Sequence, residues 1–160
     1  MPPILLIGIG NEYRSDDSVG LAAIRALKAH ELPGDTLLKE CSGDGAELME
    51  MWNTARMAML IDAVSSGAKP GTIYRFNALA HAIPAQLSFQ STHAFSVAEA
   101  IELARVLGQL PPSLIVYAIE GKNFSSGVGL SPEVEKAMRK VVEQVRNEVL
   151  DTLKQAQNAT

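Results

Sequence analysis

Short apolar runs that end at glycine or aspartate, in alternation with helical patterns, most constrain what this chain can fold into. Ile4 to Ile9 is such a run and predicts a buried strand. From Ser18 to His30 the apolar residues recur at the spacing of a helix. Further strands are predicted over 36–40, 58–62, 72–76 and 114–119, and further helices over 46–53, over 92–107 and from Pro132 onward. This alternation predicts an α/β fold, with helices covering both faces of one sheet.

Length and composition limit the classes of protein that the chain can belong to. A chain of 160 residues with 47% hydrophobic and 20% charged residues is expected to form a single domain, residues 1–160. A net charge of −4 argues against nucleic acid as a partner, because phosphates require an excess of Lys and Arg. No apolar run has the length of a membrane span and the N-terminus lacks the features of a signal peptide, so we expect a soluble cytoplasmic protein. The single cysteine, Cys41, excludes an internal disulfide and a cysteine-based zinc site.

Three side chains that can bind metal follow apolar segments that are far apart in the sequence. Asp17 lies in the turn after the first predicted strand, Asp62 ends the third, and His93 begins a helical pattern. In open α/β sheets, ligands bind outside the carboxyl ends of the strands, so Asp17 and Asp62 are expected at the same edge. Two carboxylates and an imidazole would provide an oxygen, oxygen and nitrogen set for a divalent metal.

Structural roles are the alternative for each of these residues. Ser15 can cap the helix that follows, and acids in a first turn suit the helix dipole without any ligand. A lone histidine at a helix start is more often a packed or capping residue than a ligand. Glu120 is a further candidate at the same edge. His30, His81 and Cys41 are expected to be structural, with the Cys41 thiol buried.

Nucleotide binding is the alternative for the first glycine turn. Gly8-Ile9-Gly10 after a strand resembles the beginning of a dinucleotide fingerprint. The third glycine of that fingerprint would fall at Tyr13, so the pattern fails. A tight turn between a strand and a helix requires glycine for backbone reasons alone.

Taken together, these segments resemble the hydrogenase maturation endopeptidases. The residues that carry the resemblance are Gly8-Ile9-Gly10-Asn11 with Asp16-Asp17 and Gly20, then Leu60-Ile61-Asp62-Ala63, Ser91-Thr92-His93, Ala118-Ile119-Glu120-Gly121, and the stretch 127–134. The resemblance implies a single-domain fold in three layers, with a twisted, mostly parallel, five-stranded sheet between two layers of helices. It also implies an endopeptidase that removes a short C-terminal peptide from the precursor of a hydrogenase large subunit.

The same resemblance implies roles for three residues. Asp17, Asp62 and His93 take the places of the metal-contacting residues, and Asp17 and Asp62 are also the candidates for activating water. The nickel is presented by the substrate, and no tightly bound cofactor is expected.

Two positions depart from the family pattern. Ser18 stands where the family often has glycine, which requires that the backbone there does not need a positive φ. The stretch 41–45, Cys-Ser-Gly-Asp-Gly, departs from the family's second glycine-rich turn, which suggests a different choice of substrate.

Two other functions remain open from the sequence. The chain can be a non-catalytic partner of the precursor that binds in a nickel-dependent way without cutting it. It can also be a nucleotide-binding module. Only the endopeptidase hypothesis accounts for Asp17, Asp62 and His93 together.

Overall fold

The sheet has the strand order β2-β1-β3-β6-β4 in the computed structural model, which describes residues 3–84, 87–89 and 95–159. β1 (Ile4–Ile9) lies between β2 (Thr36–Cys41) and β3 (Met57–Ser65), and is parallel to both. β6 (Ser113–Glu120) is parallel to β3, whereas the edge strand β4 (Ile73–Asn77) is antiparallel to β6. These five strands confirm the mostly parallel sheet. β5 (Ser88–Phe89) is an additional short strand that pairs antiparallel with the end of β3.

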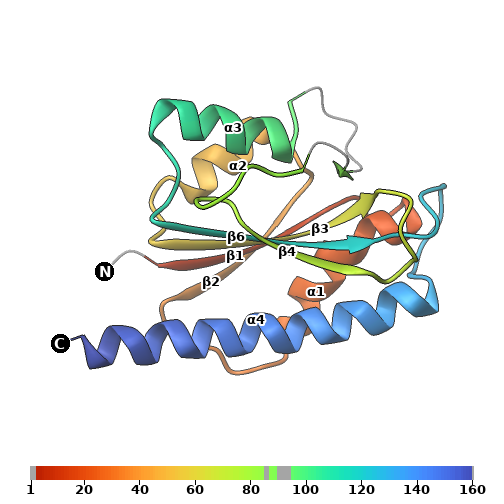
Figure 1. Cartoon of the computed structure of the whole chain (residues 1–160). Coiled ribbons are helices and arrows are strands. Elements are labelled where there is room, and N and C mark those ends of the chain that lie inside the picture. The colour runs from red at the N-terminus through yellow and green to blue at the C-terminus, as the bar shows by residue number, and fades with distance from the viewer. Residues whose placement is uncertain (1–2, 85–86, 90–94, 160) are drawn as a thin grey trace.

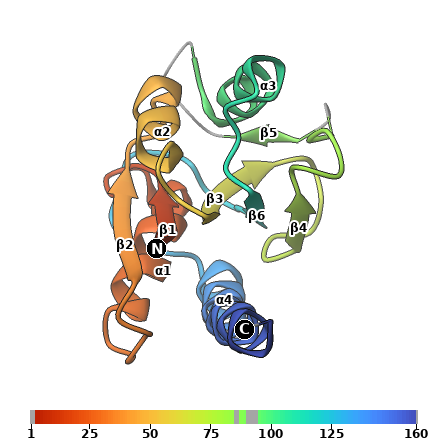
Figure 2. The same cartoon turned by 90° about the vertical axis from the view of Figure 1, so that its left-hand side faces the viewer.

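Helices cover both faces of this sheet, as the sequence predicts (Figures 1 and 2). α1 (Val19–Leu27) and the long α4 (Pro132–Asn158) lie on one face. α2 (Gly45–Trp52) and α3 (Val97–Leu107) lie on the other. A buried apolar cluster fills the space between the sheet and each pair of helices. None of the helices in the described ranges is long and apolar enough to cross a membrane.

Two glycines allow α1 to approach the sheet closely. A Cβ at Gly20 would lie 2.2 Å from the carbonyl oxygen of Ile61 and 2.4 Å from that of Ile9. A Cβ at Gly8 would lie 2.2 Å from the carbonyl oxygen of Gly20. Because all these contacts are with backbone, no side chain could move aside. The absence of two Cβ atoms therefore sets how close the start of α1 lies to the carboxyl ends of β1 and β3.

Several element boundaries differ from those predicted. β3 extends three residues beyond Asp62 to Ser65, because β6 and β5 continue to pair with it. A 3₁₀ helix, η1 (Ser15–Ser18), precedes α1, and Ser15 begins it in a left-handed conformation (φ 52°). Ser15 is therefore not the cap of α1, and its hydroxyl donates to the carbonyl of Ser125 instead. Ser18 occupies the N-cap position of α1 without a capping hydrogen bond from its side chain, and its φ of −83° confirms that the backbone there does not need a positive φ.

The third predicted helix begins later than expected. α3 starts at Val97 with Ser96 as its N-cap, so the prediction of helix is wrong for residues 95–96. The rest of the predicted first turn, together with His93, lies outside the described residues. The last helix begins as predicted, with Pro132 in its first turn and Ser131 as N-cap.

Candidate active site

Asp17 lies in η1, at the edge where the parallel strands end. Its side chain is almost completely buried. The Oδ2 atom accepts a hydrogen bond from the backbone N–H of Asn11 (3.1 Å) and lies 3.8 Å from a guanidinium nitrogen of Arg14. The other oxygen, Oδ1, is buried and has no hydrogen-bond partner among the described residues. A buried carboxylate oxygen without a partner is unfavourable, so this atom is suited to receive a cation or a proton.

Asp62 lies near the end of β3, on the sheet face that α2 and α3 cover. Alternation along the strand places it on the same face as Leu60, which belongs to the core beneath those helices. Its side chain is 2% exposed, and Oδ1 accepts the N–H of the next residue, Ala63 (2.8 Å). That single backbone hydrogen bond is weak compensation for a charge in a buried position.

Burial raises the pKa of both carboxyl groups, and the charge of Asp17 raises that of Asp62 further. The pKa of Asp62 is raised well above its ordinary value, first by burial and second by the negative charge of Asp17. The pKa of Asp17 is raised by burial, while Arg14 and the N–H of Asn11 act in the opposite direction. η1, which carries Asp17, contacts β3, which carries Asp62, so the charge of Asp17 acts on the Asp62 carboxyl group. Two buried carboxylates that repel each other can share a proton or bind a divalent cation.

Asp16 has a different role from its neighbour. Its carboxylate accepts hydrogen bonds from the backbone N–H groups of Lys122, Asn123 and Ser131 and from the hydroxyl of Ser131. Burial raises the pKa of Asp16, but these hydrogen bonds outweigh that effect and the pKa is lowered overall. Asp16 thus binds η1 to the loop between β6 and α4. From the sequence, the structural alternative for this acid was the helix dipole alone, and the glycine- and serine-rich loop gave no specific signal for the contact.

The carboxylate of Glu120 is bound by the turn that follows β3. Its carboxylate accepts hydrogen bonds from the backbone N–H groups of Ser66 and Gly67 and from the Ser66 hydroxyl. The suggestion that it belongs to the same site is therefore not supported by its contacts. Glu120 instead fixes the turn that follows β3.

The described part of the chain offers no activated nucleophile. Cys41 is buried as expected, and burial raises the pKa of its thiol to about 11. The hydroxyls of Ser15 and Ser18, which flank Asp16 and Asp17 in the chain, donate to backbone carbonyls.

His81 is exposed and lies outside any helix or strand. Within residues 3–84, 87–89 and 95–159, no three side chains of His, Cys, Asp or Glu gather as a metal site. The third predicted ligand, His93, lies outside these ranges, so its role stays a prediction.

Comparison with known proteins identifies the family. The family model described as HycI, hydrogenase maturation protease, matches residues 21–148. The chain belongs to the hydrogenase maturation protease family. Asp62 and His93 fall within the matched range, whereas Asp17 lies just before it.

Individual members of the family agree with this assignment. The chain is 26% identical over 145 residues to the hydrogenase 2 maturation protease of Escherichia coli K12, covering 89% of this chain and 87% of that protein. It is 27% identical over 146 residues to the hydrogenase expression/formation protein HupD of Thiocapsa roseopersicina, covering 89% of this chain but 65% of that protein.

Solved structures share the fold. The hydrogenase maturating endopeptidase HybD from E. coli superposes with a TM-score of 0.78 at 22% identity, over 94% of this chain and 93% of that one. An endopeptidase from E. coli superposes with a TM-score of 0.77 at 25% identity, over 89% of each chain. The three-layer α/β fold predicted for this chain is therefore confirmed as the fold of these endopeptidases.

Proposed function

We propose that this protein is an endopeptidase that removes a short C-terminal peptide from a nickel-loaded precursor of a hydrogenase large subunit. Membership in the hydrogenase maturation protease family supports the reaction and the class of substrate. The nickel belongs to the substrate, and Asp17, Asp62 and His93 are the residues that we expect to contact it.

The pair of buried aspartates is the observation that carries this proposal. Asp17 has a buried oxygen without a hydrogen-bond partner in the described structure, and its charge raises the pKa of Asp62. A divalent cation would offset both the repulsion and the missing contact, which gives a loaded precursor a bond that an unloaded one cannot form. Recognition of the metal would in this way restrict cleavage to precursors that have received their nickel.

The same carboxylates can serve the hydrolysis itself. A metal next to the scissile carbonyl would polarise it, and a carboxylate with a raised pKa is suited to accept a proton from water. A covalent route has less support, because the Cys41 thiol has a pKa of about 11 and the Ser15 and Ser18 hydroxyls donate to backbone carbonyls. We therefore propose direct attack by water, with Asp17 or Asp62 as the base.

The decisive experiment is the intact mass of a candidate large-subunit precursor after incubation with this protein, with and without nickel. We expect loss of a C-terminal peptide only from the nickel-loaded precursor. Asp17→Asn and Asp62→Asn should abolish the loss, whereas Asp151→Asn, an exposed residue of α4, should not change it. Binding of the loaded precursor without any change in mass would favour a non-catalytic binding partner instead.

A further inference from the structure

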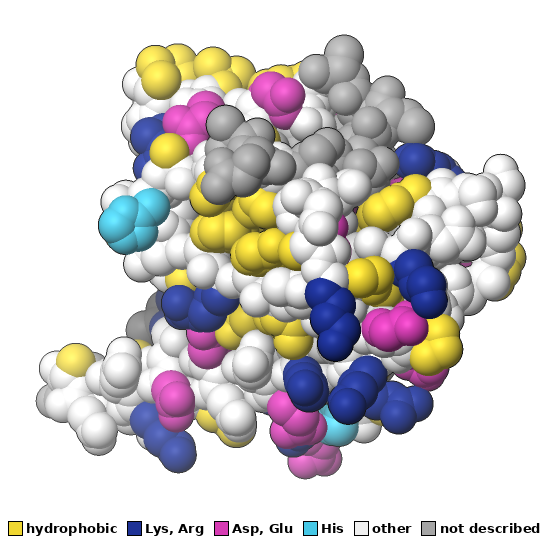
Figure 3. Space-filling model, turned by 45° about the vertical axis from the view of Figure 1, so that its right-hand side comes forward, with side chains coloured by type: hydrophobic (Ala, Val, Ile, Leu, Met, Phe, Trp, Pro, Cys, Tyr) yellow, Lys and Arg dark blue, Asp and Glu magenta, His cyan; other side chains and the backbone are white. Residues whose placement is uncertain are grey.

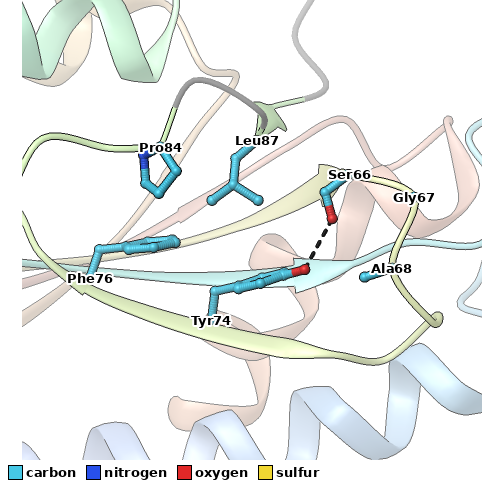
Figure 4. Close-up of a pocket in the computed structure, with 7 residues that line it drawn as sticks. All are labelled: Ser66, Gly67, Ala68, Tyr74, Phe76, Pro84 and Leu87. Carbon is cyan, nitrogen blue, oxygen red and sulfur yellow. Dashed lines mark hydrogen bonds between the residues drawn. The ribbon is translucent and has the colours of Figure 1, made fainter.

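A hollow of about 400 Å³ lies between β4 and the segment that precedes β5 (Figure 4). Tyr74 and Phe76 form one wall, and their rings stack at a centroid distance of 6.0 Å. Pro84 and Leu87 face them from the opposite side (Figure 4). The described lining consists of Ser66, Gly67, Ala68, Tyr74, Phe76, Pro84 and Leu87.

Strand register places this hollow close to Asp62. Asp62 of β3 pairs with Ala118 of β6, and Ala118 pairs in turn with Tyr74 of β4. Residues directly opposite each other on adjacent strands share a face of the sheet, so Asp62 and Tyr74 lie in one row. Two strand spacings, about 10 Å, separate their backbones. The residue between them in this row is Ala118, which packs with Leu87 in one small buried cluster.

The polar groups around the hollow already have partners. The Tyr74 hydroxyl and the Ser66 hydroxyl are 3.0 Å apart, and the Ser66 hydroxyl also donates to Glu120 (2.8 Å). The N–H of Gly67 donates to Glu120 as well. The surface that remains for a ligand is therefore mostly the aromatic rings of Tyr74 and Phe76 and the aliphatic groups opposite them. Such a lining favours an apolar group over a charged one.

Hydrophobic side chains reach the surface of the molecule. Figure 3 shows patches of hydrophobic side chains in the middle of one side of the molecule, with Lys and Arg side chains gathered below them. Tyr74 and Phe76 are only partly buried, so a bound apolar group would remove aromatic surface from water.

We propose that this hollow binds one apolar side chain of the precursor, from a residue within about three positions of the cleaved bond. The inference rests on the proposed function, which places the cleaved bond at Asp17 and Asp62. An extended peptide advances about 3.3 Å per residue, so about 10 Å corresponds to three residues. The hollow is then a specificity pocket that selects the sequence around the bond, in addition to the contact with the metal.

The test compares cleavage rates of nickel-loaded precursors that differ by one side chain. Each of the three residues on either side of the cleaved bond is changed in turn to Leu and to Ala. At the position that occupies the hollow, the wild-type protein should cleave the Leu precursor roughly 10–200-fold more efficiently, as kcat/KM, than the Ala precursor. The other positions should show a much smaller preference.

Two variants then assign the preference to the hollow. Ala68→Phe adds a ring at the rim without removing any packing, and should reduce the Leu-over-Ala ratio to about threefold or less. Phe76→Ala enlarges the hollow and should shift the preference from Leu to Phe. Ala80→Phe, the same substitution in the exposed turn after β4, is the matched control and should keep the wild-type ratio. Thermal unfolding of each variant shows whether it is folded.

The outcomes separate this inference from the function on which it rests. If wild-type protein cleaves the parent precursor but shows no position with a preference, or if folded Ala68→Phe keeps the wild-type ratio, the specificity pocket is disproved and the endopeptidase stands. If wild-type protein cleaves no loaded precursor at all, the proposed function fails and the pocket assignment fails with it.

Discussion

Asp16 and Asp17 are adjacent in the chain and almost equally buried, yet their carboxylates meet opposite environments. Asp16 accepts hydrogen bonds from three backbone N–H groups and one hydroxyl. Asp17 accepts one backbone N–H and keeps a buried oxygen that has no partner among the described residues. The pKa of Asp16 is accordingly lowered and that of Asp17 raised. One residue is thus committed to the structure, and its neighbour is left available for a ligand.

Asp62→Asn should stabilise the protein and remove its activity. Asparagine can keep the hydrogen bond from the Ala63 N–H while it eliminates the buried charge that Asp17 repels. We expect the free energy of unfolding at pH 7 to rise by roughly 0.5–2 kcal/mol, within the range of single stabilising substitutions. Cleavage should fall by roughly 10²-fold or more, as for the loss of a general base. Urea unfolding and precursor cleavage measure the two effects, and a clear loss of stability would contradict this account of the site.

The stabilisation by Asp62→Asn should depend on pH. The pKa of Asp62 in the folded protein lies above its ordinary value of 3.8. Between these two values the folded wild-type protein therefore binds more protons than the unfolded protein does. The unfolding free energy of the wild type therefore decreases, relative to the variant, as pH rises through that interval. The difference in unfolding free energy between Asp62→Asn and the wild type should be largest above the folded pKa and vanish near pH 3.8 and below. Urea unfolding at a series of pH values tests this. A stability difference between variant and wild type that increases as the pH falls would contradict the prediction.

Asp16→Asn should destabilise the protein, with the opposite dependence on pH. Each buried N–H that loses its acceptor costs about 1–3 kcal/mol, so we expect a loss of at least about 2 kcal/mol at pH 7. Because the folded pKa of Asp16 lies below 3.8, its contribution is present at neutral pH and lost as pH falls through the folded value. Glu133→Gln removes an exposed carboxylate near the same loop and should stay within about 0.5 kcal/mol of wild type. Equal unfolding free energies for the two variants would show that Asp16 is not a structural link.

Gly20→Ala should destabilise the protein because the added Cβ meets backbone. Its distances to the carbonyl oxygens of Ile61 and Ile9 would be 2.2 and 2.4 Å, so α1 must move away from the sheet. Overpacking of this kind costs about 1–3 kcal/mol. Gly34→Ala is the matched control, since nothing lies within 4 Å of a Cβ there, and it should be nearly neutral. Thermal unfolding compares the two, and similar melting temperatures would contradict the close approach of α1.

Cys41 should not react with thiol reagents while the protein is folded. Its thiol is 4% exposed and its pKa is raised to about 11, so very little thiolate is present near neutral pH. Alkylation by iodoacetamide at pH 7.5 should be roughly a hundredfold or more slower than that of glutathione. Mass spectrometry follows the reaction, and concentrated guanidinium chloride should restore full labelling. Rapid labelling of the folded protein would mean that the thiol is accessible.

Strand assignments from the sequence were correct where local pattern alone decides them. The apolar runs at β1, β3 and β6 predicted buried strands because parallel strands covered on both faces have few polar positions. Strand ends were less accurate. β3 continues past Asp62 because β5 and β6 pair with its last residues, and such pairing comes from segments distant in the sequence.

The sequence by itself determined the α/β fold, the family, and the expectation that Asp17 and Asp62 meet at the edge of the sheet. The positions of strands and helices follow from apolar patterns, which are local, and the carboxyl ends of parallel strands share one edge of the sheet. Tertiary structure alone decided that Asp16 binds the loop before α4, that Glu120 is occupied by Ser66 and Gly67, and that Tyr74 shares a row with Asp62. The physical reason is that burial, hydrogen-bond partners and cross-strand neighbours depend on segments brought together only by folding.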